Sequence, residues 1–254
     1  MSHWSRRETI PTEEVLRELA EEARAAGESE IVVETTHEAG EAWIRAGFAE
    51  LARTLSISLA ALEGRMGPAK EPSLGSVHVQ SDDLDAVVRA VQTFVPRLGH
   101  SEGSVVLPPA EGWIAVFDEL TEREPELLRR LAREISDRMG AFVIAVGAEE
   151  GRVVRYVALE RGRVVDEYLS VPEYYGELPP GEVIALGANP RLMSRMTGAD
   201  ADEVRRVAQT ADLPEALPPT RELLAGIARL FGVPAAEMSF RDALGAQGAI
   251  AVER

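Results

Sequence analysis

The chain contains no cysteine, and this absence excludes several kinds of site. Without cysteine, its 254 residues can form no disulfide, supply no thiol nucleophile and offer a metal no thiolate ligand. Lys70 is the only lysine and Asn189 the only asparagine, so arginine carries nearly all of the positive charge. That bias is typical of GC-rich genomes, and we expect a bacterial protein.

Long apolar runs are also missing. No window approaches the run of about 20 uncharged apolar residues that a membrane helix needs. The chain starts MSHWSRRETIPTEE, which becomes polar where a signal peptide would carry its apolar stretch. The sequence therefore predicts a cytoplasmic protein that does not insert into a membrane.

Positive charge is scarce relative to negative charge. The sequence has 27 basic and 43 acidic residues, a formal net charge of −16. Such a balance opposes non-specific binding to nucleic acid or anionic lipid and favours a basic or small-molecule partner. The only adjacent basic pair between Asp200 and Leu213 is Arg205-Arg206, with acids around it, so a DNA-reading helix pair is also disfavoured.

The familiar catalytic and nucleotide-binding motifs are absent. There is no P-loop, no dinucleotide-binding glycine pattern, no HExxH and no GxSxG. The four histidines, His3, His37, His78 and His100, lack the local spacing of a metal site. The sequence predicts no cofactor and favours a protein without enzymatic activity.

Composition changes and turn residues divide the chain into three predicted parts. Residues 1–72 are expected to be mainly helical, with one helix after Thr12 and another over 44–62, separated by a strand over 31–36. Residues 73–178 form the predicted core. Residues 179–254 are expected to form a small helical segment whose tail frays.

The order of elements in the central part predicts an α+β fold. Its pattern is β-α-β-β-α-β followed by a hairpin around Arg161-Gly162, which is the outline of a ferredoxin-like sandwich. The hairpin register would place Glu160 opposite Arg163 and Val157 opposite Asp166. In this fold both helices cover one face of the sheet, so the other face needs a lid or a partner. The predicted elements are strands over 76–80, 104–107, 113–118 and 141–146, helices over 82–98 and 121–139, and hairpin strands over 152–160 and 163–169.

The first candidate site lies on the uncovered face. His78 alternates with Val77 and Val79 and so points away from the helices. Trp113 and Phe117 on the third strand and Tyr156 on the hairpin would join it in a ligand pocket. The alternative is a core packed under a helix that carries Leu51, Leu55 and Leu59.

The second candidate site is acidic. If the first and third strands are parallel neighbours, Asp82 and Asp83 share a rim with Asp118 and Glu119. Four carboxylates could bind a divalent cation or act as acid and base. The alternative is helix capping, because each pair lies just before a predicted helix.

A tyrosine-rich segment is the third feature. Asp166, Glu167 and Tyr168 are followed by Glu173, Tyr174 and Tyr175, a mixture suited to recognition of a protein or a polar ligand. An edge strand with its exit loop is the alternative. Taken together, the sequence predicts a binding or protein-interaction module, with an acidic inhibitor or immunity-like protein as one version and homo-oligomers allowed. A small-molecule sensor or an enzyme that uses His78 or the acidic rim is the second hypothesis.

Overall fold

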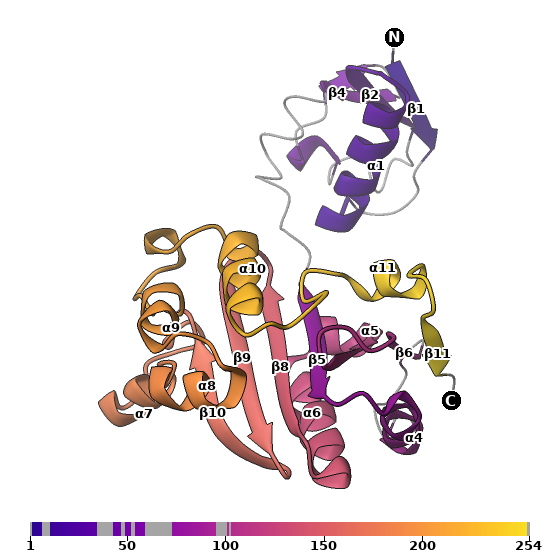
Figure 1. The fold of residues 1–254 in the computed structure, drawn as a ribbon. Helices are drawn as coiled ribbons and strands as arrows, with labels where there is room; N and C mark the ends of the chain where they lie inside the picture. The colour runs from indigo at the N-terminus through magenta and orange to yellow at the C-terminus, as the bar shows by residue number, and fades with distance from the viewer. Residues whose placement is uncertain are drawn as a thin grey trace. The chain divides into compact units, whose positions relative to one another are not determined.

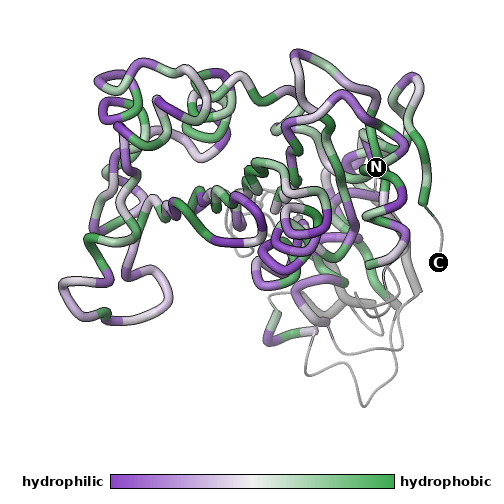
Figure 2. The backbone as a smooth tube through the Cα atoms, turned by 60° about the horizontal axis from the view of Figure 1, so that its bottom comes forward, coloured by the Kyte–Doolittle hydropathy of each residue, from purple (hydrophilic) through white to green (hydrophobic). Residues whose placement is uncertain are grey.

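The chain folds into two compact units, residues 1–70 and 71–254, which are described separately. A computed structural model describes residues 2–6, 11–34, 43–46, 49–51, 54–58, 73–94, 101 and 103–252. None of the helices in these ranges is both long and apolar enough to cross a membrane. Accordingly, hydrophobic stretches along the backbone are short and are interrupted by hydrophilic residues (Figure 2).

The first unit is a four-stranded sheet with a helix packed on it (Figure 1). The sheet has the order β1-β2-β4-β3, in which β1 and β2 are parallel and the other pairs antiparallel. As predicted, Thr12 caps the helix, accepting a hydrogen bond from the amide of Val15. Leu19, Ile31 and Trp43 are core residues of this unit. Its elements are β1 (Ser2–Arg6), α1 (Glu13–Ala25), β2 (Glu30–Glu34), β3 (Ala49–Leu51) and β4 (Thr54–Ser58).

The prediction of a helix over 44–62 is wrong. Strands β3 and β4 occupy this part of the chain, and β4 pairs with β2, with Leu55 opposite Val33 and Ile57 opposite Ile31. The helical spacing misled because it joined Leu51 and Leu55, which lie in different strands, whereas within β4 Leu55 and Ile57 alternate with polar residues, the period of a strand. Pairing with an existing strand then decided between the two periods. The described residues of this unit therefore form a helix and a sheet, where mainly helices were expected.

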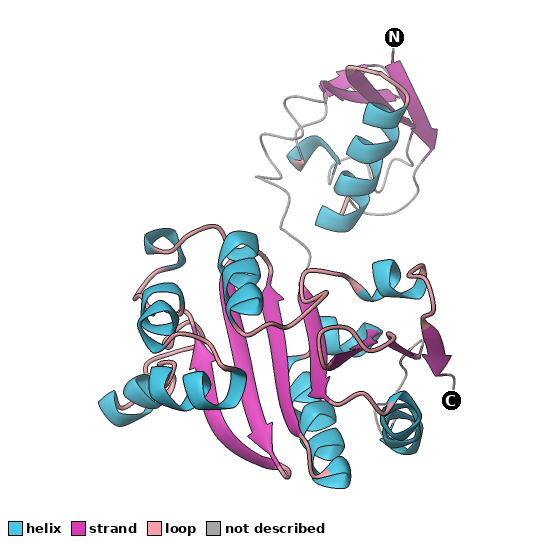
Figure 3. Cartoon of the chain, viewed as in Figure 1, coloured by secondary structure: helices cyan, strands magenta, loops and turns pink. Residues whose placement is uncertain are grey.

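The second unit is built on a seven-stranded antiparallel sheet with the order β10-β9-β8-β5-β7-β6-β11 (Figure 3). The α+β class is thus confirmed, and all the predicted strands of the core and the hairpin are present. The tail expected to fray forms β11, which pairs with β6. The strands are β5 (Leu74–Gln80), β6 (Ser104–Val106), β7 (Trp113–Asp118), β8 (Phe142–Glu149), β9 (Val153–Glu160), β10 (Arg163–Leu169) and β11 (Ile250–Val252).

Helices cover both faces of this sheet. On one face, Val77 and Val79 pack with α4 and α6, as predicted. The face expected to be open is covered by the C-terminal residues, from which Leu224, Phe231 and Phe240 contribute to the core (Figure 1). Residues 179–254 thus complete the fold of the sheet. The helices are α4 (Leu84–Phe94), α5 (Glu119–Arg123), α6 (Pro125–Met139), α7 (Pro180–Ala185), α8 (Pro190–Thr197), α9 (Ala201–Val207), α10 (Thr220–Leu230) and α11 (Phe240–Leu244), with a short 3₁₀ turn at Pro214–Ala216.

The hairpin of β9 and β10 has one register shift. Arg161 and Gly162 both have positive φ, 50° and 72°, which is the backbone of a type I′ turn. Glu160 is opposite Arg163, as predicted. The expected pairing of Val157 with Asp166 is wrong, because a β-bulge at Val165 moves Asp166 opposite Ala158.

Candidate functional site

His78 is a polar residue on the central strand of the large sheet. It lies on β5, opposite Ala115 of β7 and Ile144 of β8, and none of its surface is exposed. Its Nε2 atom is 2.8 Å from the hydroxyl of Ser76, which is also fully buried. This distance suits a serine nucleophile and a histidine base. No third group orients the ring, however, because Nδ1 has no hydrogen-bond partner among the described residues.

Burial determines the protonation state of His78. Desolvation lowers the pKa of His78 to about 3, so the ring is neutral at ordinary pH. A neutral imidazole next to a serine can act as a base only where substrate can reach it. The C-terminal layer covers this face of the sheet, so the Ser76–His78 pair is closed to solvent in this structure.

The aromatic residues predicted to surround His78 fall into two groups. Phe117 contacts the histidine ring edge to face, with 6.5 Å between the ring centroids. Trp113 and Tyr156 belong to a different core cluster. In it, Trp113 packs on Phe142 with 6.1 Å between the ring centroids, and Tyr156, on β9, packs with the C-terminal helices. Successive pairings put Tyr156 three strands from Phe117, about 14 Å away at the usual strand spacing. All four predicted pocket residues are core side chains, at most 4% exposed.

The structure separates the four carboxylates predicted to share a rim. The prediction that the first and third strands are parallel is wrong, since β5 and β7 are antiparallel and Gln80 pairs with Trp113. Asp82 and Asp83 therefore lie near the start of β7, whereas Asp118 is its last residue, about 17 Å along the strand. Among the described residues no group of three or more acids or histidines is arranged to hold a metal ion.

One carboxylate of each pair, Asp83 or Asp118, caps a helix, which was the alternative interpretation, and Glu119 pairs with Arg123 at 2.7 Å. Asp83 accepts a hydrogen bond of 2.9 Å from the amide of Ala86 in α4. Asp118 caps α5 through the amide of Leu120, and its other oxygen accepts from the hydroxyls of Ser101 and Ser104. Burial raises the pKa of the Asp118 carboxyl, while these hydrogen bonds oppose the rise.

A second buried carboxylate, Asp166, was predicted to face Val157 and instead belongs to a polar network. The bulge turns it to the C-terminal layer, where it accepts hydrogen bonds from the Tyr156 hydroxyl at 2.7 Å and the Asn189 amide at 3.1 Å. Tyr156 stacks on Tyr168 with 5.2 Å between ring centroids. Burial raises the pKa of Asp166, and its partners satisfy it, so the network joins the hairpin to α8. Nothing in the local sequence pattern signalled the bulge.

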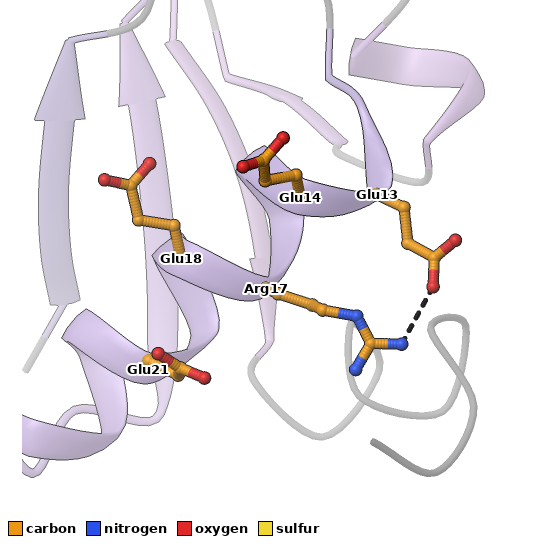
Figure 4. A pocket seen from close by; sticks show the side chains of 5 residues that line it. All are labelled: Glu13, Glu14, Arg17, Glu18 and Glu21. Atoms are coloured by element: carbon orange, nitrogen blue, oxygen red, sulfur yellow. Dashed lines mark hydrogen bonds and ion pairs between the residues drawn. The ribbon is translucent and has the colours of Figure 1, made fainter. Parts of the chain in front are cut away.

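The first unit has a shallow pocket beside α1, of about 460 Å³ (Figure 4). The described residues that line it come from one helix, and Arg17 pairs with Glu13 at 2.8 Å. Glu14, Glu18 and Glu21 are the other described residues that line it. A row of glutamates along one helix is the ordinary solvated face of an amphipathic helix, so it assigns no ligand.

Three exposed apolar side chains of the second unit lie on the chain that follows β10 and on the turn after α9. Tyr175 is 60% exposed, Ile184 78% and Leu213 63%. They come from two segments, 170–186 and 211–217, which together contain five acids and no basic residue. We call these two segments together the acidic apolar surface. All five acids are exposed: Glu173, Glu177, Glu182, Asp212 and Glu215.

A small apolar cluster holds the two segments together. Leu186 of the first segment and Leu217 of the second both pack against the buried cluster of Val153, Leu169 and Val171. Backbone hydrogen bonds join Ala211 to Ser170 and Leu169 to Leu186, at 2.9 and 3.0 Å. The surface is thus anchored to the sheet, and it includes the tyrosine-rich segment that the sequence predicts as a recognition segment.

The two arginines next to this surface are already paired. Arg152 lies 3.5 Å from Glu215, and Arg155 forms an ion pair with Glu149. The Tyr175 hydroxyl bonds to Glu149, and the Arg155 guanidinium lies 5.5 Å from the centre of the Tyr175 ring. Tyr175 is therefore held in place with much of its ring facing solvent.

Comparison with known proteins assigns no function to the Ser76–His78 pair or to the acidic apolar surface. No protein-family model, no curated protein and no solved structure matches the chain.

Proposed function

We propose that this protein is a binding module that acts by contacting a basic protein partner, as an acidic inhibitor or immunity-like protein does. The observation that carries the proposal is the acidic apolar surface, where three large apolar side chains are exposed among five acids. Apolar groups surrounded by charge mark interaction sites more often than scattered apolar residues do. The net charge of −16 would speed the approach of a cationic partner.

The residues that could act in catalysis are placed where they cannot reach a substrate together, and this favours a binding function. Ser76 and His78 are sealed in the core, and Asp118 is a helix cap. The carboxylates at the two ends of β7 are too far apart to share a substrate atom or a metal ion. By contrast, the acidic apolar surface is accessible without any movement of the fold.

We also infer that β5, α4, β6, β7, α6 and β8 form a ferredoxin-like core. The order β8-β5-β7-β6 with antiparallel neighbours supports this, because it is the order that two interleaved β-α-β units produce. On this view β9, β10 and the C-terminal helices were added to the core. The additions supply both the cover of the second face and the acidic apolar surface.

Co-purification of partners with tagged full-length chain would test the proposed function. We expect a basic protein to be retained by the wild type and lost with Ile184→Ser, since this change removes apolar contact area at an exposed position without disturbing the core. Leu244→Ser is the matched control, because Leu244 has the same size as Ile184 and its side chain is also exposed, at 49%. It lies on α11, outside the acidic apolar surface. Equal retention by both variants would contradict the proposal, as would equal loss.

A second candidate function rests on the Ser76–His78 pair. The unpaired Nδ1 atom in a fully buried ring is unusual and would be satisfied by a ligand or a water beneath the C-terminal layer. A small-molecule sensor would bind there. Its test is a thermal-shift screen in which Ser76→Ala abolishes the response of any hit, and a screen without a Ser76-dependent hit would reject it.

A further inference from the structure

No side chain of the helix α7, which lies within the acidic apolar surface, is fully buried. The helix has six residues, Pro180–Ala185. Isolated helices shorter than about 12 residues are marginal in water, so such a helix gains stability when something packs on it. Ile184, at 78% exposure, is the largest apolar side chain that it presents.

The two segments of this surface carry negatively charged residues and no positively charged ones. Glu177, Glu182 and Asp212 have no ion-pair partner among the described residues, and the two segments contain no lysine or arginine of their own. Arg191 and Arg195 on α8 are the next basic residues along the chain after the first segment, and they mark where the acidic run ends. Three carboxylates without an ion pair among the described residues therefore face solvent on the same two segments as the exposed apolar groups.

These features restrict what can bind. A nucleic acid or an anionic membrane would bring its own negative charge against the carboxylates. A second copy related by a two-fold axis would also oppose acid to acid, because both copies present the same patch. A cationic segment carrying a large apolar side chain satisfies both the charge and the apolar surface.

Resting on the proposed function, we propose that the acidic apolar surface binds a short cationic amphipathic segment of the partner protein. Its apolar side chain packs on Ile184 of α7, with Tyr175 and Leu213 contributing further apolar surface. Its lysines or arginines pair with Glu177, Glu182 and Asp212. The nearby Arg152 and Arg155 stay bound to Glu215 and Glu149 and so do not compete for these carboxylates.

Fluorescence anisotropy with the full chain tests this proposal without a known partner. The probe is a labelled amphipathic peptide of leucine and lysine at helical spacing. Comparison peptides are an oligolysine with the same number of charges and a leucine–glutamate peptide of the same pattern. We expect the leucine–lysine peptide to bind at least about tenfold more tightly than either, and added salt to weaken it only in part.

Paired variants separate this surface from general attraction to an acidic protein. Glu177→Lys/Asp212→Lys should weaken the leucine–lysine peptide at least about tenfold, and Ile184→Ser should do the same. The matched controls are Glu111→Lys/Glu237→Lys, which makes the same charge change at exposed sites elsewhere, and Leu244→Ser. Both controls should leave the affinity within about twofold of wild type, which is small beside a tenfold effect.

Three outcomes would overturn the proposal. Equal weakening by the control variants would show attraction to the whole acidic molecule, and equal binding of oligolysine would show that apolar contact contributes nothing. Binding of the leucine–glutamate peptide would show that charge plays no part. If these results coincide with Ile184-dependent capture of a natural partner, the binding function stands and only the chemistry assigned to the partner is wrong.

Discussion

His78 is the residue at which burial and protonation are most closely linked. Its pKa is 6.5 in an exposed chain and about 3 in the folded protein, because burial penalises the charged ring. Because the pKa is lower in the folded protein, the unfolded chain takes up the proton at a higher pH than the folded protein does as the pH falls. The stability contributed by the neutral ring is therefore complete above about pH 6.5 and is lost as the pH falls toward 3.

We predict that stability falls by about 1.4 kcal/mol per pH unit in this window through His78 alone. Asp118 and Asp166, whose pKa values are raised by burial, act in the opposite sense, because their folded forms retain protons. Urea unfolding between pH 7 and about 5, compared with His78→Leu, isolates the histidine. An identical pH slope in the variant would show that His78 does not titrate on unfolding.

Gly162 occupies a position that no larger residue fits. Its φ is +72°, and an added Cβ would lie 2.8 Å from the Cβ of Asp137 on α6. We predict that Gly162→Ala destabilises the protein by about 2 kcal/mol or more, combining backbone strain with the clash. Gly232→Ala is the control, since φ there is +65° with open space around it, and should cost about 1 kcal/mol. Equal midpoints in thermal unfolding would contradict the role assigned to the Asp137 contact.

At the scale of elements, the bulge in β10 decides which layer Asp166 faces. Val164 packs with the α6 layer, Asp166 bonds to Tyr156 on the opposite side, and Glu167 returns to pair with Arg129 of α6. Strict alternation would have directed Asp166 to the apolar α6 layer, and the extra residue prevents that. The bulge also disturbs the ladder of the outermost strand, which discourages further pairing there.

We predict that deletion of Val165 costs about 3 kcal/mol or more, because it moves a carboxylate into an apolar layer or breaks the register of the hairpin. Val165→Ala keeps the bulge and should cost about 1 kcal/mol. Chemical denaturation of the two variants measures the difference. Similar losses would indicate that the bulge does not control the orientation of Asp166.

At the scale of the whole molecule, the C-terminal residues belong to the same core as the sheet. Leu223, Leu224, Ile227 and Phe231 of the α10 region are at most 4% exposed and pack with Tyr156 and Ile144. Burial of four such side chains is worth about 8 kcal/mol in total. That is comparable to the entire stability of an ordinary domain.

We therefore predict that the chain truncated after Leu178 does not keep a folded second unit. Its sheet would expose an apolar face and should aggregate or bind a hydrophobic dye, as measured by light scattering and dye fluorescence. Truncation after Gly248 removes β11 alone and should leave the rest of the sheet folded. If the chain that ends at Leu178 is monomeric and unfolds cooperatively, the C-terminal segment is dispensable for folding.

Much of the local structure followed from sequence because the signals there are short in range. Thr12 caps a helix as predicted, and Glu160 pairs with Arg163 across the turn. Alternation along β5 correctly placed Val77 and Val79 on the side of the helices and His78 on the other side. The failures at 44–62 and at Asp166 arose where pairing with a distant strand or an extra residue overrode the local pattern.

The sequence by itself determined the mixed class of the fold, most strand and helix positions, the net charge and the tyrosine-rich exit of β10. Only the tertiary structure decided the direction of β5 against β7, which separates the four carboxylates, and the cover that buries His78. Strand direction and cover depend on contacts between residues far apart in the chain, and a local apolar pattern looks the same whatever packs against it.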